Sequence, residues 1–90
     1  MLIDDHKVNE SIGTQLRRIR EKKGMSQWLA AEKAGVSETT YGTIERAKFN
    51  IKLVDLIRIS EVLKADLHEI IRIAIEEAER RNEEDSYDGR

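Results

Sequence analysis

The side chains that could take part in chemistry are mostly charged, but they follow no catalytic pattern. His6 and His68 lie far apart in the sequence, and the chain has no cysteine that could join either of them in a metal site. Neither a glycine-rich phosphate loop nor a nucleophile motif is present. The acidic residues Glu76, Glu77 and Glu79 have the pattern of a solvated helix face. We therefore expect no enzyme activity, no metal or cofactor, and no small-molecule ligand.

The remaining chemistry is that of basic side chains, which are concentrated in one segment although the net charge is −2. Residues 11–52 hold nine Lys and Arg against four Glu, a surplus of +5. Residues 53–90 hold six basic and eleven acidic side chains. Because surface fields are screened over about 10 Å, the local surplus matters more than the sum. This division predicts one surface that meets phosphate groups and another that does not.

Apolar periodicity and capping residues in the first half predict three helices joined by short loops. After a flexible arm at residues 1–8, Asn9 or Ser11 can cap a first helix that stops at Gly24. Ser26 caps a short second helix, and Ser37 caps a third that runs to about residue 46. No segment alternates as a strand would.

The second half predicts two further helices. The fourth carries a mostly apolar stripe of Leu53, Leu56, Ile57, Ser60 and Leu63. Asp66 and Glu69 are spaced as a capping box at the start of the fifth. Its stripe consists of Leu67, Ile70, Ile71, Ala74, Ile75 and Ala78 and ends at about residue 79, and the last residues of the chain are expected to fray. The predicted fold is all-α, a compact five-helix bundle with an extended final helix. Its one domain spans residues 9–71, and 72–90 form a C-terminal helix extension and acidic tail.

The segment from Gln27 to Arg46 has the features of two helices that cross at a steep angle. Gly35 supplies a backbone that can take a positive φ at the turn, and Ala31 leaves space for the partner helix. The positions that must be apolar inside such a pair are Ala30, Ala34, Val36, Tyr41 and Ile44. This combined spacing favours a helix-turn-helix over an ordinary helical hairpin.

Residues 12–71 resemble the phage-repressor-like, or Xre-type, helix-turn-helix family. The matching elements are Ile12-Gly13, residues 16–20, 24–27, 31–37 and 44–46, and the helices between 53 and 71. The resemblance implies a compact five-helix DNA-binding domain that acts as a homodimer on a pseudo-palindromic site in double-stranded DNA. A chain with no ligand-sensing domain would suit a small repressor, a restriction–modification controller or an autoregulating antitoxin.

The family's docking geometry implies that the start of the third helix faces base edges in the major groove. Glu38, Thr39 and Thr43 occupy these base-facing positions. Glu38 could accept from a cytosine amino group or could only stabilise the helix N-terminus. Phosphate contacts are implied for Gln27, Thr40, Arg46 and Lys48.

Two further sets of residues have structural roles in this interpretation. Arg20 and Glu45 match the family's buried ion pair, which links the first helix to the third. Ala74, Ile75 and Ala78, on the extended apolar stripe of the final helix, are the expected dimer surface; the alternative is that this stripe packs onto the fourth helix of the same chain.

Several residues depart from the family pattern. Trp28 could lie against the DNA backbone or against a neighbouring helix, and Ala30 is smaller than the usual residue. Gly42 lies inside the third helix, where it could permit close approach to DNA or leave the helix to firm up on binding. Ala47 and Lys64 stand where the family commonly has glycine, so those turns could differ.

A second hypothesis is a protein-interaction module that keeps this fold without binding DNA, which the acidic pI of about 5.7 favours weakly. The sequence shows no apolar run of about 20 residues and no signal-peptide pattern. We expect a cytoplasmic protein that does not enter the membrane.

Overall fold

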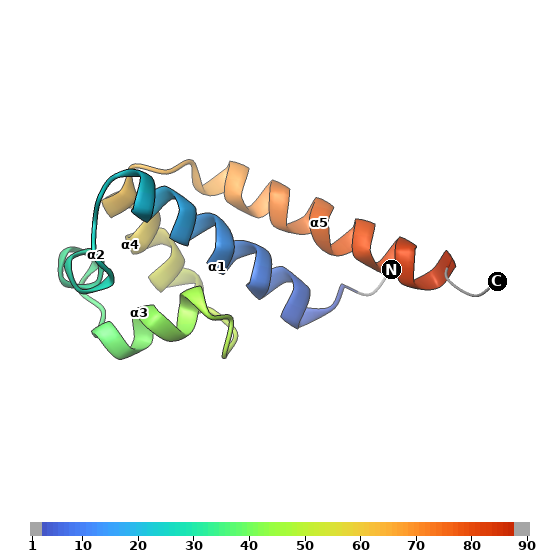
Figure 1. Cartoon of the computed structure of the whole chain (residues 1–90), viewed down its shortest axis with the longest axis horizontal. Helices are drawn as coiled ribbons and strands as arrows, with labels where there is room; N and C mark the ends of the chain where they lie inside the picture. The colour runs from blue at the N-terminus through green and yellow to red at the C-terminus, as the bar shows by residue number, and fades with distance from the viewer. Residues whose placement is uncertain (1–2, 88–90) are drawn as a thin grey trace.

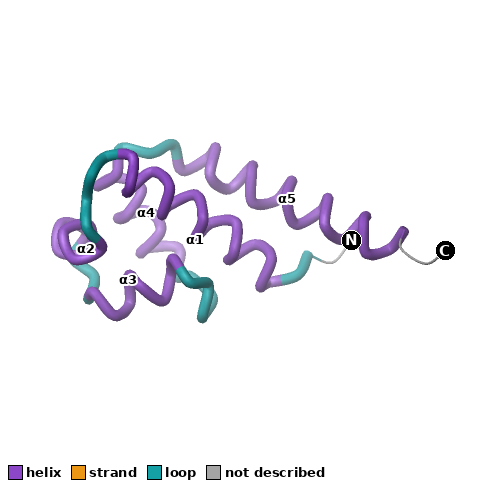
Figure 2. Tube along the Cα trace, in the orientation of Figure 1, coloured by secondary structure: helices purple, strands orange, loops and turns teal. Residues whose placement is uncertain are grey.

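The computed structural model describes residues 3–87, and side chains over residues 3–79. It contains five α-helices: α1 (Asp5–Lys22), α2 (Gln27–Ala34), α3 (Glu38–Glu45), α4 (Leu53–Leu63) and α5 (Leu67–Tyr87) (Figure 1). Figure 2 shows short loops between the helices and no strand in the described part of the chain. The all-α five-helix prediction is confirmed.

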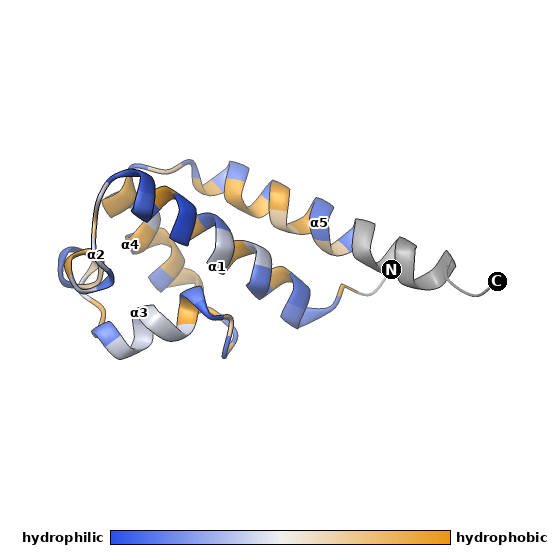
Figure 3. Cartoon of the chain, in the orientation of Figure 1, coloured by the Kyte–Doolittle hydropathy of each residue, from blue (hydrophilic) through white to orange (hydrophobic). Residues whose placement is uncertain are grey.

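The longest packing contact joins α1 and α5, which run antiparallel along one side of the molecule (Figure 1). The core between the helices is formed by side chains that are almost fully buried, among them Leu16, Tyr41, Ile59 and Leu63. Figure 3 shows hydrophobic residues over much of α4 and on one side of α1. Burial of apolar surface against α4 therefore holds the short helix α2 in place, and α3 packs in turn against α1 and α2.

The first helix starts earlier than predicted. Asp4 is its cap: the carboxylate accepts hydrogen bonds from the backbone N–H groups of His6 and Lys7. Neither Asn9 nor Ser11 caps the helix, because both lie within it. Residues 5–8, predicted to be part of a flexible arm, form its first turn.

The turns follow the sequence signals more closely. Gly24 and Gly35 both take a positive φ after α1 and α2, and Ser26 and Ser37 cap α2 and α3 through their hydroxyl oxygens. The turns at Ala47 and Lys64 do not differ in conformation from glycine turns: both residues take a left-handed φ, near 57° and 54°. This costs about 1–2 kcal/mol for a residue with a Cβ atom.

The last helix is longer than its apolar stripe. Asp66 caps its first turn by accepting from the backbone N–H of Glu69, as the capping box predicts. The Glu69 carboxylate, however, pairs with Arg72 and does not return to the cap. The helix continues to Tyr87, past the end of the stripe near Ala78. Residues 88–90 lie outside the described part of the chain.

None of the helices in the described part of the chain is both long and apolar enough to cross a membrane.

Candidate nucleic-acid interface

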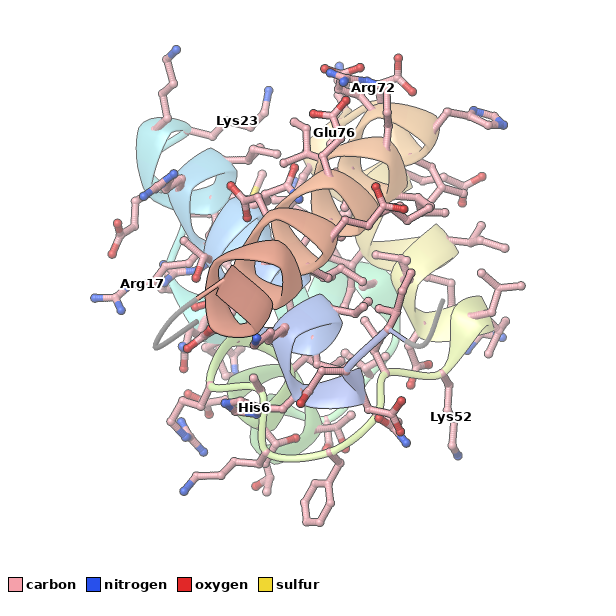
Figure 4. All side chains as sticks on the ribbon, turned by 90° about the vertical axis from the view of Figure 1, so that its right-hand side faces the viewer. His6, Arg17, Lys23, Lys52, Arg72 and Glu76 are labelled. Atoms are coloured by element: carbon pink, nitrogen blue, oxygen red, sulfur yellow. The ribbon has the colours of Figure 1, made fainter. Side chains whose placement is uncertain are left out.

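The third helix lies at the edge of the molecule opposite α5, as Figures 1 and 4 both show. It is held there by α1, which approaches it without intervening side chains. A Cβ atom on Gly13 would lie 2.6 Å from the Ile44 carbonyl oxygen and 2.7 Å from that of Glu45. Since no real Cβ is found so close to backbone, glycine at position 13 permits this contact and so fixes the position of α3.

A buried ion pair joins the same two helices. Arg20 donates to both carboxylate oxygens of Glu45, at 2.7 and 3.0 Å, and to the Met25 carbonyl oxygen at 2.7 Å. Gln27 donates to the same carboxylate at 2.9 Å, which ties the start of α2 to the end of α3. The expected role of Arg20 and Glu45 agrees with this geometry. The pair is bidentate and buried, so it fixes α3 against α1.

The pair also sets the charge states of its members. Burial alone would raise the pKa of Glu45, but the hydrogen bonds from Arg20 and Gln27 outweigh it and lower the pKa below its ordinary value. The hydrogen bond to Glu45 raises the pKa of Arg20. Tyr41 is fully buried beside them, and burial, together with the nearby Glu45 charge, raises the pKa of its phenol. All three residues therefore keep their usual charge at neutral pH.

The predicted base-facing residues line the outer side of α3. Glu38 and Thr39 are exposed in its first turn, and Thr43 is half-buried one turn later. Thr39 and Thr43 also line an open groove of about 490 Å³ between α3 and the segment at 49–52. The Thr43 hydroxyl donates to the Thr40 carbonyl oxygen at 2.7 Å. Its proton is thus engaged, so towards a ligand Thr43 offers an acceptor oxygen and a methyl group.

The residues predicted to contact phosphate differ in how accessible their side chains are. Lys48 and Arg46 are exposed after the last turn of α3. Thr40 is exposed, but its hydroxyl is hydrogen-bonded to the Ser37 cap at 2.9 Å. The side chain of Gln27 is half-buried, and its amide nitrogen is bonded to Glu45. Gln27 can therefore meet a phosphate through its backbone N–H at the start of α2, where amides have no acceptor within the helix.

The basic segment does not gather wholly around α3. In Figure 4, Lys52 points to the lower side of the molecule, near α3. Arg17 points outward on the flank, and Lys23 lies on the upper side towards α5. Counting charge along the chain thus located the surplus, but only some of its members share a face with the third helix.

The expected dimer surface is corrected by the burial of its residues. Ala74 and Ala78 are 1% and 0% exposed in the single chain, because α1 packs over them. Only Ile75, at 38%, remains accessible to a partner.

Two features of this region were missed in the sequence. Asn9 accepts a hydrogen bond from the Ile51 backbone N–H and donates to the Asn50 side chain, so it anchors the loop after α3. Phe49 in that loop is 72% exposed, and the apolar residues Leu53, Val54 and Ile57 on α4 are exposed as well. The number of apolar residues between 49 and 57, more than one buried helix face can hold, could have indicated the second feature. No local signal indicates the first, since Asn9 and Ile51 are 42 positions apart.

Trp28 is 57% exposed in the first turn of α2, so it is not packed inside the domain. Ala30 beside it is fully buried.

A short helix capped after a tight glycine turn, locked to a first helix by a buried ion pair, defines the helix-turn-helix class of DNA-binding domain. A helix-turn-helix family model matches residues 16–70, and the chain belongs to this family of Xre, or phage-repressor-like, proteins. No curated protein matches the sequence.

Solved structures of regulators share the fold. The N-terminal DNA-binding domain of SinR from Bacillus subtilis is 33% identical and has a TM-score of 0.65, over 69% of this chain and 91% of that one. The restriction–modification controller protein C.AhdI from Aeromonas hydrophila is 29% identical, with a TM-score of 0.66, over 69% and 94%. The clp gene regulator ClgR from Corynebacterium glutamicum is 25% identical, with a TM-score of 0.69, over 76% and 88%.

Proposed function

We propose that this protein is a sequence-specific regulator of transcription, of the small repressor or controller type, which places α3 in the major groove of double-stranded DNA. The observation that carries the proposal is the outer side of α3, where Glu38, Thr39 and Thr43 lie at the surface on a rigidly held helix. The similarity to DNA-binding and controller proteins supports the same function. Such a protein would act in the cytoplasm, where the DNA is.

The hydrogen bonds that each threonine hydroxyl already forms determine which base atoms it can contact. Because the Thr43 hydroxyl donates to the Thr40 carbonyl oxygen, its oxygen is suited to accept from an adenine or cytosine amino group, and its methyl group can contact a thymine methyl. Thr39 forms no such backbone bond among the described residues and can donate or accept. Lys48 and Arg46 then hold the phosphates on either side without reading sequence.

The protein is proposed to bind as a homodimer. Two recognition helices can enter successive major grooves on one side of DNA only if the two-fold axis points towards the DNA. The dimer surface must then lie to the side of α3. The α4 patch, defined as the exposed apolar residues Leu53, Val54 and Ile57, lies there: Figure 4 shows α4 on the flank, with α3 below it and α5 above.

Single substitutions distinguish the two surfaces. Leu53→Asp is expected to convert the dimer to a monomer in sedimentation equilibrium, because it places a charge in the centre of the α4 patch. The matched control Ile75→Asp, on α5, is expected to leave the mass unchanged. Loss of the dimer in Ile75→Asp alone would contradict the α4 patch.

DNA binding itself is tested by fluorescence anisotropy with labelled duplexes. Six or more phosphate contacts predict a loss of affinity of about 10³-fold between 50 and 200 mM salt. Thr43→Ala should change the preference between sequences by about 1–3 kcal/mol, whereas Lys48→Ala should weaken all sequences alike. Equal behaviour of the two variants would contradict the division into base-reading and phosphate-holding residues. Absent or salt-independent binding would instead favour a protein-interaction module.

A further inference from the structure

A glycine in the middle of the third helix has a neighbour that explains its presence. Gly42 is buried, although α3 is at the surface. A Cβ atom there would lie 3.0 and 3.5 Å from the two terminal guanidinium nitrogens of Arg46, and 3.5 Å from the Gln27 side-chain oxygen. The guanidinium of Arg46 therefore lies across the bare backbone of Gly42. The missing side chain makes room for Arg46 and does not face the DNA.

Of the two side chains that lie against Gly42, Gln27 is held by a hydrogen bond and Arg46 is not. Gln27 is held by its bond to Glu45, which turns its amide oxygen towards Gly42. Arg46 forms neither an ion pair nor a side-chain hydrogen bond with any described residue, so its guanidinium donors remain available. The first amides of α2, beginning at Gln27, are unpaired within their helix and carry partial positive charge.

We propose that Gly42 is a positioning residue, which seats the Arg46 guanidinium against α3 beside the start of α2 and so presents it ready to bind one DNA phosphate. This proposal rests on the proposed DNA-binding function. A guanidinium held in place before binding loses less side-chain entropy on meeting the phosphate than one that extends into solvent. The helix accepts an unfavourable glycine in exchange for this orientation.

If Gly42 positions Arg46 in this way, replacing it by alanine should raise the stability of the protein and lower its affinity for DNA. In Gly42→Ala, the new Cβ displaces the end of a flexible side chain and no backbone. Alanine is also the better helix former, so the melting temperature is expected to rise by about 4–8 °C. Affinity for DNA is nevertheless expected to fall about tenfold, because Arg46 no longer rests beside α2. A glycine that serves packing alone would lower the melting temperature when replaced.

The test is a double-mutant cycle on a labelled 20-base-pair duplex of fixed arbitrary sequence, at about 50 mM salt. Gly42→Ala should weaken binding about tenfold when Arg46 is present and less than about twofold in the Arg46→Ala background. As a matched control, Gly42→Ala should retain its full tenfold effect in the Lys48→Ala background, since Lys48 does not contact Gly42. Arg46→Ala should lower the slope of log affinity against log salt by about 0.9.

Three results would overturn the proposal that Gly42 positions Arg46. They are an unchanged DNA affinity in Gly42→Ala, an undiminished loss of affinity from Gly42→Ala in the Arg46→Ala background, or a lower melting temperature in Gly42→Ala. If the wild-type chain binds no duplex, the proposed function fails, and the seat is tested in the free protein. Nuclear Overhauser contacts between the Arg46 δ-methylene and the Gly42 α-protons should then be present in the wild type. Their absence would overturn the seat independently of DNA.

Discussion

Replacing Glu45 by alanine is expected to destabilise the protein by about 3–5 kcal/mol. The Glu45 and Arg20 side chains are only 2% and 10% exposed. The carboxylate accepts two hydrogen bonds from Arg20 and one from Gln27, and all three are lost in the variant. The guanidinium would stay buried with the Met25 carbonyl as its remaining close acceptor. Since a chain of this length is expected to have a stability of about 5–13 kcal/mol, the loss would be a large part of the total.

The assay is urea denaturation followed by far-ultraviolet circular dichroism. The control is Glu76→Ala, which removes an exposed partner of Arg72 far from Arg20 and should cost less than about 0.5 kcal/mol. A double variant, Arg20→Met with Glu45→Leu, should recover most of the loss, because it removes both charges and keeps the volume. A cost below about 1 kcal/mol for Glu45→Ala, or no recovery in the double variant, would refute this reasoning.

Three further predictions concern the same helices. Gly13→Ala should cost about 1–3 kcal/mol, because its Cβ would meet the carbonyl oxygens of Ile44 and Glu45; an unchanged melting temperature would contradict the close approach of α1 and α3. The depressed pKa of Glu45 gives a stability that is complete above its ordinary value of 4.5 and is lost as the pH falls through the lower pKa of the folded state. Equal stability at about pH 7 and pH 3 would argue against this coupling. Asn9→Ala should speed hydrogen exchange of the Ile51 backbone amide, because this amide donates a hydrogen bond to the Asn9 side-chain oxygen at 3.2 Å. Unaltered exchange would show that the loop is held by other contacts.

Local signals predicted those parts of the fold that depend on a few neighbouring residues. Gly24 and Gly35 end helices because a positive φ is easy only for glycine, and Ser26 and Ser37 begin helices because their hydroxyls can accept a free backbone N–H. The Arg20–Glu45 pair came instead from the family resemblance, since no local rule joins positions 25 residues apart.

The errors come from contacts between segments distant in the sequence. Asn9 has the residue type of a helix cap, but its side chain is used by the loop after α3, and Asp4 caps the helix. The final helix packs along α1, and Ala74 and Ala78 are buried within the single chain. Periodicity identified the apolar face of α5 correctly but could not show how much of it α1 covers.

Gly42, a glycine inside α3, is another residue whose role depends on a contact that the sequence pattern does not show. Sequence propensity gives only the cost of a glycine inside a helix, about 1 kcal/mol relative to alanine. The compensating contact with Arg46 depends on where that side chain folds, which the structure shows and the sequence pattern does not.

The central claim, that the protein reads DNA sequence as a dimer through α3, is tested most directly by selection of bound duplexes from a random pool. A dimer that reads DNA through α3 should enrich a pseudo-palindromic motif with two half-sites about 34–36 Å apart, which is one turn of DNA, or a multiple of that distance. Thr43→Ala should select a motif altered at the same position in both half-sites. Recovery of no motif, or of one unaffected by substitutions at Thr39 and Thr43, would contradict the claim.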